Sequence, residues 1–251
     1  MAKIIILGSS NAIADKDHEN AHMVIVGKTR KVLVDSPRNP IFRLKDVGVN
    51  FNDITDLVLT HFHPDHASGI PLLLMDMWLR GRENPLNIYG LDHALTRLEN
   101  LMDAFAWDMW PNFFSVTFNR IPSQKYSPLL SCMDFDIYAS EVCHMIPTIG
   151  LRVEFKESGK VAAYSCDTEP CNEVLRLAHG VDALIHEASG DFLGHSSSKQ
   201  AAECATKAEA KKLYLIHYPT GEFWNENLLE DARKHFNGEV ELTEDFMELE
   251  F

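Results

Sequence analysis

Three histidines and an aspartate stand within residues 60–66, directly after an apolar run. The segment reads Thr-His-Phe-His-Pro-Asp-His, so its ligand-type residues are His61, His63, Asp65 and His66. Side chains alternate along an extended segment, so His61 and His63 are expected to point the same way. Pro64 suits the first turn of a helix, which brings Asp65 and His66 to a second side of the same space. This spacing favours zinc, manganese or iron(II) over calcium or magnesium.

The chain also has to supply the elements that position these side chains. Apolar alternation predicts strands over residues 3–7, 23–26, 31–34, 56–60, 86–89, 113–121, 134–140, 141–145, 151–155, 161–165, 183–186 and 212–216, and near Val240. Helices are expected over residues 64–78, 93–106, 171–178, 197–208 and 225–235, with a break in the first near Gly69 and with Asp92 as the cap of the second. Strands that then alternate with helices, in two similar halves, indicate two sheets packed face to face with helices outside.

The pattern His-x-His-x-Asp-His after a strand resembles the signature of the metallo-β-lactamase superfamily. The resemblance implies an α/β fold, a four-layered αββα sandwich of two mixed sheets with outer helices. It implies a single domain over residues 1–251, with a one- or two-metal site at one edge.

The resemblance also implies the rest of the metal shell. His144, Asp167 and His217 each follow an apolar run. By the match, the first ion has His61, His63 and His144, the second has Asp65, His66 and His217, and Asp167 bridges both. A buried structural role for His144 and a helix-capping role for Asp167 remain as alternatives. Two divalent ions, zinc or else manganese or iron, would hold a hydroxide nucleophile between them, which Asp65 would also orient.

Two further segments resemble the ribonuclease Z-like branch of that superfamily. Residues 184–189 read Leu-Ile-His-Glu-Ala-Ser, and residues 194–198 read Gly-His-Ser-Ser-Ser. The match assigns His195 as the acid that protonates the leaving oxygen and Glu187 as the group that orients it. A histidine beside a carboxylate suits this chemistry near neutral pH. The alternative for His195 is an ordinary loop residue beside a helix cap.

Three neighbouring residues have expected supporting roles. Asp35 matches the aspartate that the superfamily keeps beneath the metal loop, although an ordinary turn residue is the alternative. Cys166 replaces the glycine usual in the family and is expected to pack rather than to bind metal. His186 is expected to point away from Glu187 and to be structural. The aromatic residues Trp78, Trp107, Trp110, Phe113 and Phe114 are expected to lie mostly in the core, with a pocket lip as the alternative.

Two features separate the chain from typical ribonuclease Z enzymes. Only residues 156–160 stand where those enzymes carry a basic tRNA-binding arm, and the formal net charge is −14. We therefore expect a phosphodiesterase for a small or cyclic phosphodiester, with nucleic acid disfavoured as a substrate. The alternatives are tRNA 3′ processing and lactonase or arylsulfatase chemistry. A diiron redox protein, which would place a glutamate at His63, and a non-catalytic binding module are less favoured.

Composition sets the remaining expectations. The 251 residues are 45% hydrophobic and 24% charged, which is typical of a globular protein. No apolar run approaches the roughly 20 residues needed to cross a bilayer, so no membrane partner and a cytoplasmic location are expected. The five cysteines lack zinc-finger spacing and are expected to be reduced. A homodimer is compatible with the resemblance.

Overall fold

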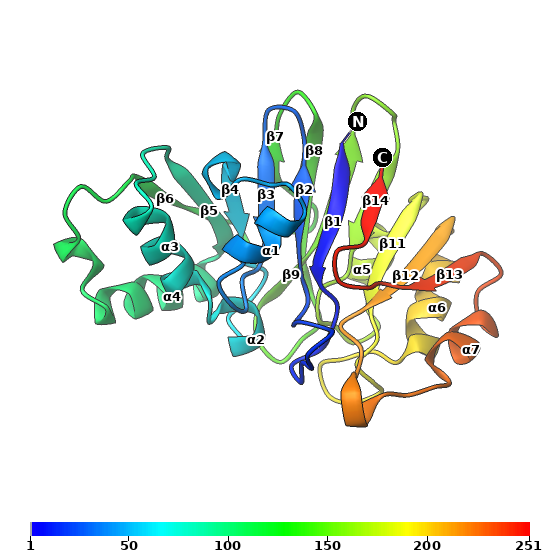
Figure 1. Cartoon of the computed structure of the whole chain (residues 1–251). Coiled ribbons are helices and arrows are strands. Elements are labelled where there is room, and N and C mark those ends of the chain that lie inside the picture. The colour runs from blue at the N-terminus through cyan, green and yellow to red at the C-terminus, as the bar shows by residue number, and fades with distance from the viewer. Residues whose placement is uncertain (1) are drawn as a thin grey trace.

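Two seven-stranded sheets pack face to face in the computed structural model, which describes residues 2–251 (Figure 1). The first sheet has the strand order β14-β1-β2-β3-β4-β5-β6, and the second has the order β13-β12-β11-β10-β9-β8-β7. The strands of the first sheet are β1 (Lys3–Gly8), β2 (His22–Val26), β3 (Lys31–Val34), β4 (Asp56–Val58), β5 (Leu86–Leu91), β6 (Val116–Ile121) and β14 (Glu248–Glu250). Those of the second are β7 (Ser127–Ser131), β8 (Phe135–Val142), β9 (Thr148–Phe155), β10 (Val161–Tyr164), β11 (Ala183–Glu187), β12 (Lys212–Ile216) and β13 (Glu239–Leu242).

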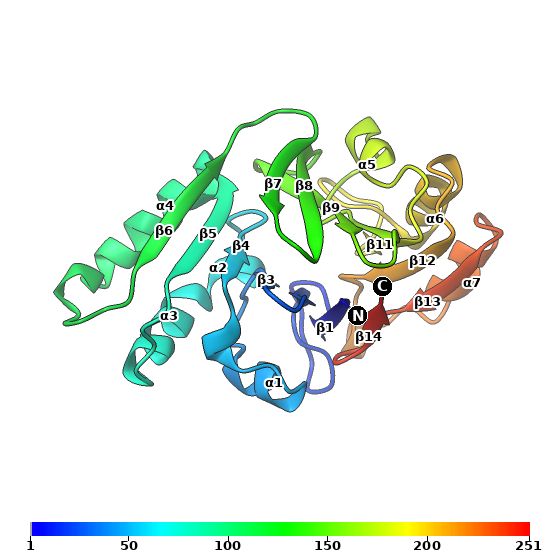
Figure 2. The same cartoon turned by 90° about the horizontal axis from the view of Figure 1, so that it is seen from above.

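Helices cover the outer face of each sheet, as the view from above shows (Figure 2). The helices are α1 (Ile41–Asp46), α2 (Pro64–Ala67), α3 (Ile70–Leu79), α4 (Asp92–Ala104), α5 (Asn172–Leu177), α6 (Ser198–Lys207) and α7 (Leu228–Arg233), with 3-10 turns at Phe51–Asp53, Trp107–Met109 and Gly221–Phe223. Alternation along β1 makes the layers visible: Ile4 and Ile6 face the other sheet, whereas Ile5 and Leu7 pack under the helices. A separate core lies under α5, α6 and α7. The expected αββα sandwich is confirmed.

The polar side chains of interest follow parallel strands. β10, β11 and β12 pair in parallel, and so do β3, β4 and β5. The carboxyl ends of parallel strands meet at one edge of a sheet. In the first sheet this edge carries Asp35 after β3 and residues 60–66 after β4. In the second sheet the corresponding edge carries Asp167 after β10, Glu187 at the end of β11 and His217 after β12.

Several predicted boundaries were wrong for physical reasons. Residues 134–145 do not form two strands, because β8 runs without interruption to Val142 opposite Thr148 of β9. Asp92 does not cap α4 but is its first residue, since Leu91 occupies the extended position before the helix. By contrast, the break predicted near Gly69 is present, because the helix that begins at residue 64 divides there into α2 and α3. The elements α1, β7 and β14 were not predicted from the sequence.

The connection between β9 and β10 is as short as the sequence predicts. Glu154 pairs with Val161, and the amide of Phe155 donates to the carbonyl of Lys160 at 2.9 Å. The two strands therefore form a tight hairpin with no inserted arm at this position. Within residues 2–251, none of the helices combines the length and the apolar character that a membrane crossing requires.

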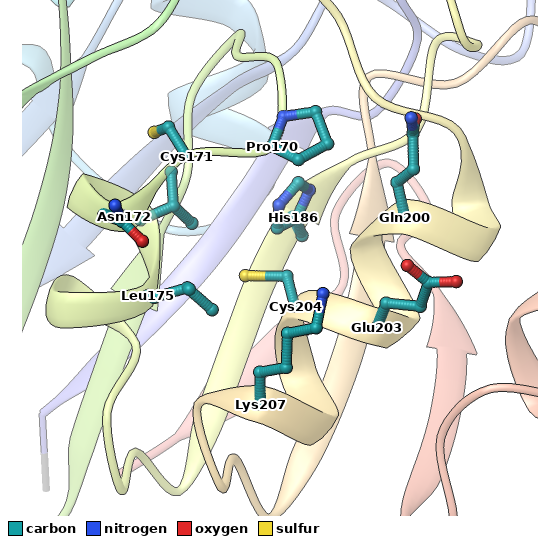
Figure 3. Close-up of a pocket in the computed structure, with 10 residues that line it drawn as sticks. Pro170, Cys171, Asn172, Leu175, His186, Gln200, Glu203, Cys204 and Lys207 are labelled. Carbon is teal, nitrogen blue, oxygen red and sulfur yellow. The ribbon is translucent and has the colours of Figure 1, made fainter.

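His186 points into a cavity behind the edge that carries the polar residues. The cavity has a volume of about 260 Å³ and is also lined by Cys171, Gln200 and Cys204 (Figure 3). The His186 ring is fully buried, with Nδ1 donating to the carbonyl of Glu187 at 2.8 Å. It therefore faces away from the carboxyl group of Glu187. Burial lowers the pKa of His186 from 6.5 to about 4.

This buried histidine predicts a specific loss of stability in acid. Unfolded chain binds a proton at His186 below pH 6.5, whereas the folded chain does so only near pH 4, so protonation favours unfolding in that window. The free energy of unfolding should fall by about 2 kcal/mol between pH 6.5 and pH 5 through this residue alone. Denaturant titrations of the metal-free protein and of His186→Gln should differ in this pH slope. Parallel pH curves for the two proteins would contradict the prediction.

Candidate metal centre

The loop between β4 and α2 places its histidines side by side. Val58 ends β4, and His63 is the extended residue that precedes α2, with Pro64 in the first turn. His61 Nε2 lies 3.1 Å from His63 Nδ1. The short helix then carries Asp65 and His66, as the sequence predicts. The loop thus presents two nitrogen atoms on one side and a carboxylate and a nitrogen on the other.

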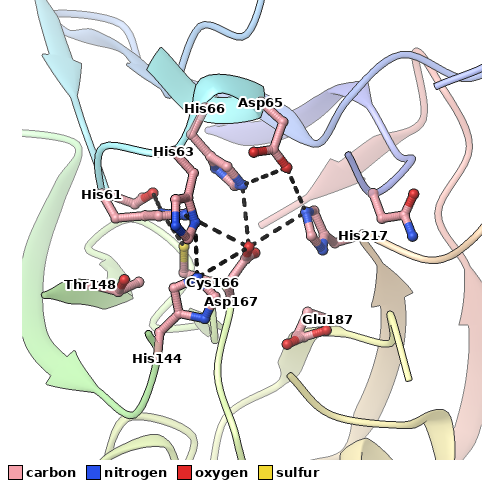
Figure 4. A network of polar contacts seen from close by, with 12 residues as sticks. His61, His63, Asp65, His66, His144, Thr148, Cys166, Asp167, Glu187 and His217 are labelled. Carbon is pink, nitrogen blue, oxygen red and sulfur yellow. Dashed lines mark hydrogen bonds and ion pairs between the residues drawn. The ribbon is translucent and has the colours of Figure 1, made fainter. Parts of the chain in front are cut away.

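The first donor set consists of His61, His63, His144 and Asp167 (Figure 4). His144 reaches it from the loop between β8 and β9, with Nε2 at 3.1 Å from His63 Nδ1. Asp167 Oδ2 lies 3.7 Å from His61 Nε2 and 4.0 Å from His144 Nε2. Four donors about 2.0–2.1 Å from one tetrahedral ion lie roughly 3.3 Å apart, so these separations suit a single ion.

The second donor set consists of Asp65, His66, Asp167 and His217. His66 Nε2 lies 3.6 Å from Asp65 Oδ2 and 3.5 Å from Asp167 Oδ2. His217 Nε2 lies 3.4 Å and 3.6 Å from the same two oxygen atoms. Asp167 Oδ2 therefore belongs to both sets. All seven side chains that the sequence suggested as metal ligands lie together at this edge.

The chemistry of the donors fits cations rather than internal hydrogen bonding. His66 Nε2 and Asp167 Oδ1 are buried without a hydrogen-bond partner among residues 2–251. Burial lowers the pKa values of His61, His63 and His144, which leaves their rings neutral. Burial by itself would raise the pKa of Asp167, but His217 and His66 outweigh it and hold that pKa well below its ordinary value. The three neutral imidazoles of the first set and the ionised carboxylate of Asp167 are ligands that divalent metals bind. In the second set, burial is outweighed by Asp167, which raises the pKa values of His66 and His217, so a bound cation would take the place of protons on these two rings.

A second set of contacts fixes which nitrogen each histidine presents. His66 Nδ1 donates to Asp35 Oδ2 at 2.8 Å, and His144 Nδ1 donates to the carbonyl of Gly194 at 2.6 Å. His217 Nδ1 donates to Ser189 Oγ at 2.7 Å. In these three rings Nδ1 is held by an outer oxygen atom, so Nε2 is the nitrogen that faces Asp167 and can bind a metal.

Asp35 lies beneath the metal loop, as the resemblance implies. Its carboxylate accepts hydrogen bonds from the amide of Thr60 at 2.8 Å and from Thr60 Oγ at 2.7 Å, in addition to His66. The roles of Ser189 and Gly194 were not predicted, although both residues stand in segments that the sequence singled out. Only the folded chain shows that their oxygen atoms face histidines far away in sequence.

Glu187 and His195 form a pair beside the two donor sets. His195 Nδ1 donates to Glu187 Oε1 at 3.0 Å, and the amides of Thr168 and Ser196 donate to the same oxygen. Burial raises the pKa of Glu187, although the hydrogen bond from His195 opposes this. The His195 ring lies 5.0 Å from the ring of His144 and is stacked 5.7 Å from that of His217. Its Nε2 remains available on the edge opposite Glu187.

Cys166 lies under the centre rather than in it. Its Sγ is fully buried and lies 3.7 Å from His61 Nδ1, the nitrogen that faces away from Asp167. Burial raises the pKa of the Cys166 thiol well above its usual value, so the thiol stays protonated. The residue packs within the core between the sheets. This placement agrees with the packing role expected from the sequence.

The aromatic residues form a cluster with α3 and α4. Trp78 stacks on Trp110 with ring centroids 5.1 Å apart, and Phe113 meets Trp107 edge to face at 5.7 Å. These rings pack against the core between the first sheet and its helices, in which Phe114 is buried. Their main role is therefore packing, as expected.

Comparison with known proteins gives the family. The model of the family described as Anti-Pycsar protein Apyc1 matches residues 2–240. Ribonuclease Z of Methanothermobacter thermautotrophicus is 27% identical and covers 94% of this chain and 92% of its own. Ribonuclease Z of Bacillus licheniformis is 29% identical, with 91% of each chain covered. The metallo-β-lactamase fold protein YhfI from Bacillus subtilis superposes with a TM-score of 0.84 at 21% identity, covering 100% of this chain and 99% of its own.

These similarities agree with the donor geometry. The relatives are ribonuclease Z proteins, and the fold is that of the metallo-β-lactamase superfamily. The buried histidines and aspartates fit the divalent metals that such hydrolases use. The chain therefore belongs to the family described as Anti-Pycsar protein Apyc1, among the ribonuclease Z-like, metal-dependent hydrolases of the metallo-β-lactamase superfamily.

Proposed function

We propose that the protein is a dinuclear zinc phosphodiesterase that cleaves a small phosphodiester, such as a cyclic nucleotide or an aryl phosphodiester. The observation that carries the proposal is the Glu187–His195 pair beside two donor sets that share Asp167. A phosphodiester needs both functions, because its phosphorus is shielded by negative charge and its leaving oxygen departs as a strong base.

The proposed reaction assigns a separate role to the metal ions, to Asp65 and to the His195–Glu187 pair. Two bound divalent ions would supply an acidified water molecule and would offset charge on the phosphoryl oxygens. Asp65, whose side chain is the one partly exposed member of the second donor set, would orient the attacking water by accepting its hydrogen bond. His195 donates the proton of Nε2 to the leaving oxygen, and Glu187 keeps the ring in that orientation.

Features away from the centre support a small substrate. The hairpin between β9 and β10 provides no extended arm that could hold a folded RNA. The formal net charge of −14 opposes a broad electrostatic contact with a polyanion. A small diester avoids this repulsion because it contacts little beyond the cationic centre. The free thiols of all five cysteines support a cytoplasmic location as part of the same proposal.

The test is hydrolysis of bis(p-nitrophenyl) phosphate by protein loaded with zinc or manganese. We expect metal-dependent release of one p-nitrophenolate per diester, and cleavage of 3′,5′-cyclic nucleotides to monoesters. A panel of lactones and a panel of aryl sulfates test for lactonase and arylsulfatase activity. Cleavage of lactones or sulfate esters without diester turnover, in a preparation with full metal content, would refute the proposal.

RNA 3′ processing is the second candidate, because the relatives named ribonuclease Z match over nearly their full length. A gel assay with precursor tRNA separates the two candidates. The absent arm and the negative charge predict weak cleavage that is suppressed by moderate salt. Efficient cleavage at physiological ionic strength would favour the RNA substrate instead.

A further inference from the structure

Three exposed apolar side chains border the His195 imidazole. Phe192 is 54% exposed, Leu193 is 74% exposed and Met145 is 51% exposed. They lie around the same turn: the Phe192 ring lies 4.8 Å from the His195 ring, Leu193 follows Phe192 in the chain, and Met145 Cγ lies 3.0 Å from the position that a Cβ at Gly194 would take. We call Met145, Phe192 and Leu193 the apolar rim. Apolar side chains that meet solvent beside catalytic groups are typical of a binding surface.

The turn that presents the rim is held in place. Its ends are Gly190, with φ of 144°, and Gly194, with φ of 81°. A side chain at residue 194 would approach His144 Nδ1 to 2.8 Å, so only glycine lets the turn come this close to a metal-donor residue. The Gly194 amide also donates to Glu169 Oε1 at 2.8 Å. The rim is therefore a preformed surface, fixed relative to the donor sets.

The orientation of His195 indicates which part of the substrate faces the apolar rim. Nδ1 of His195 is taken by Glu187, so the proton available to a substrate is on Nε2. The leaving oxygen must approach Nε2 within hydrogen-bond distance. Because the Phe192 ring lies 4.8 Å from this imidazole, a substituent on the leaving oxygen is within reach of the apolar rim.

We infer that the apolar rim is a subsite for an aromatic or heteroaromatic group carried by the leaving oxygen of the substrate. The inference rests on the proposed phosphodiesterase function and adds its leaving-group preference. In the reaction, an oxygen of water bonds to phosphorus and releases one proton to solvent while the P–O bond to the leaving group breaks; His195 regains a proton from solvent after turnover. The electron pair stays on the leaving oxygen, which takes the proton of His195 Nε2. The products are a phosphate monoester and an alcohol or phenol.

The kinetic test uses two diesters with the same leaving group. Bis(p-nitrophenyl) phosphate has an aryl group on both sides, whereas methyl p-nitrophenyl phosphate has one only on the leaving oxygen. We expect Phe192→Ala combined with Leu193→Ala to lower kcat/KM on both substrates by about fivefold to tenfold, mainly through KM. Phe192→Tyr keeps an aromatic ring at this position, so it should lose less kcat/KM than Phe192→Ala. Met133→Ala removes a methionine that is 83% exposed in the turn between β7 and β8, and is the matched surface control.

Each other outcome has a defined meaning. A loss confined to bis(p-nitrophenyl) phosphate would place the aryl group on the retained side and overturn the inference. Unchanged kinetics on both diesters would also overturn it, while the phosphodiesterase function would stand. Because Phe192 and Leu193 are exposed, the double variant should melt at the same temperature as the wild type. A thermal melt therefore distinguishes a loss of substrate binding from a folding defect.

A binding measurement keeps the inference testable without turnover. Calorimetric titration of the zinc-loaded protein with phenylphosphonate and methylphosphonate measures the preference for an aromatic group beside a phosphoryl group. The wild type should bind phenylphosphonate about fivefold more tightly, and the double variant should lose this preference. A wild type without diesterase activity that still shows this loss would refute the proposed function but retain an aromatic subsite. Equal binding of both phosphonates by the wild type would overturn the subsite itself.

Discussion

Asp167→Asn is expected to remove at least one metal equivalent per chain and to lower kcat/KM for bis(p-nitrophenyl) phosphate about 10³-fold or more. Asp167 Oδ2 lies 3.5 Å from His66 Nε2 and 3.6 Å from His217 Nε2, and also belongs to the other donor set. Asparagine keeps the shape but lacks the negative charge that both sets share. Inductively coupled plasma mass spectrometry after desalting, together with initial rates, measures both effects.

The control is an aspartate-to-asparagine change outside the centre. Asp182 accepts from the amide of Val161 at 2.8 Å and pairs with Lys211 at 2.7 Å, ahead of β11. Asp182→Asn should keep the metal content and the rate within about twofold, because it removes a partly exposed ion pair. Full metal occupancy in Asp167→Asn, with a rate near that of the wild type, would show that Asp167 does not bridge two ions.

The metal centre could be predicted because its residues stand in sequence-local patterns. His61, His63, Asp65 and His66 share one loop after a strand, so strand alternation and a helix-starting proline are enough to bring them together. Asp167 and His217 follow the strands β10 and β12, and the parallel strands β10, β11 and β12 end at one edge of the second sheet. His144 follows β8, which pairs antiparallel with β9 and so runs in the same direction as β10. Resemblance to a known family assigned them to particular ions.

The elements that the sequence did not predict depend on partners far away. β14 is a strand because Leu249 pairs with Ile4 across nearly the whole chain. β7 contains Pro128 and a register shift, so its pattern alone is weak. α1 spans only Ile41–Asp46, with no side-chain cap, and owes its stability to packing under the first sheet. Local propensity carries little information about such segments.

The outer hydrogen bonds of the ligands were missed for a related reason. Ser189 faces His217, and the carbonyl of Gly194 faces His144, across 28 and 50 positions of sequence. A serine and a backbone carbonyl are too common for their types to indicate such a role. These oxygen atoms are needed because a buried imidazole nitrogen requires a hydrogen-bond partner, and only the folded structure shows which oxygen lies next to it. Orienting residues that stand in a recognisable motif, such as Asp35 and Glu187, could be predicted, whereas Ser189 and the carbonyl of Gly194 could not.

His195→Ala is expected to lower the rate without changing the metal content. The ring is placed by its 3.0 Å hydrogen bond to Glu187 and lies beside, not within, the two metal-donor sets that share Asp167. Loss of a general acid costs about 10²–10⁴-fold when the leaving group is a strong base. The effect should therefore approach 10²-fold or more on methyl phenyl phosphate, yet stay near tenfold on bis(p-nitrophenyl) phosphate.

This difference between leaving groups separates acid catalysis from a structural defect. Nitrophenolate is a weak base and departs with little help from a proton, whereas phenolate needs one. A displaced loop would slow both esters equally, because it would disturb the centre itself. Glu187→Gln should show the same leaving-group dependence in weaker form, since glutamine can still accept from His195 Nδ1 but carries no charge to stabilise the imidazolium. Equal losses on the two esters, or an unchanged rate in His195→Ala, would remove His195 from the role of acid.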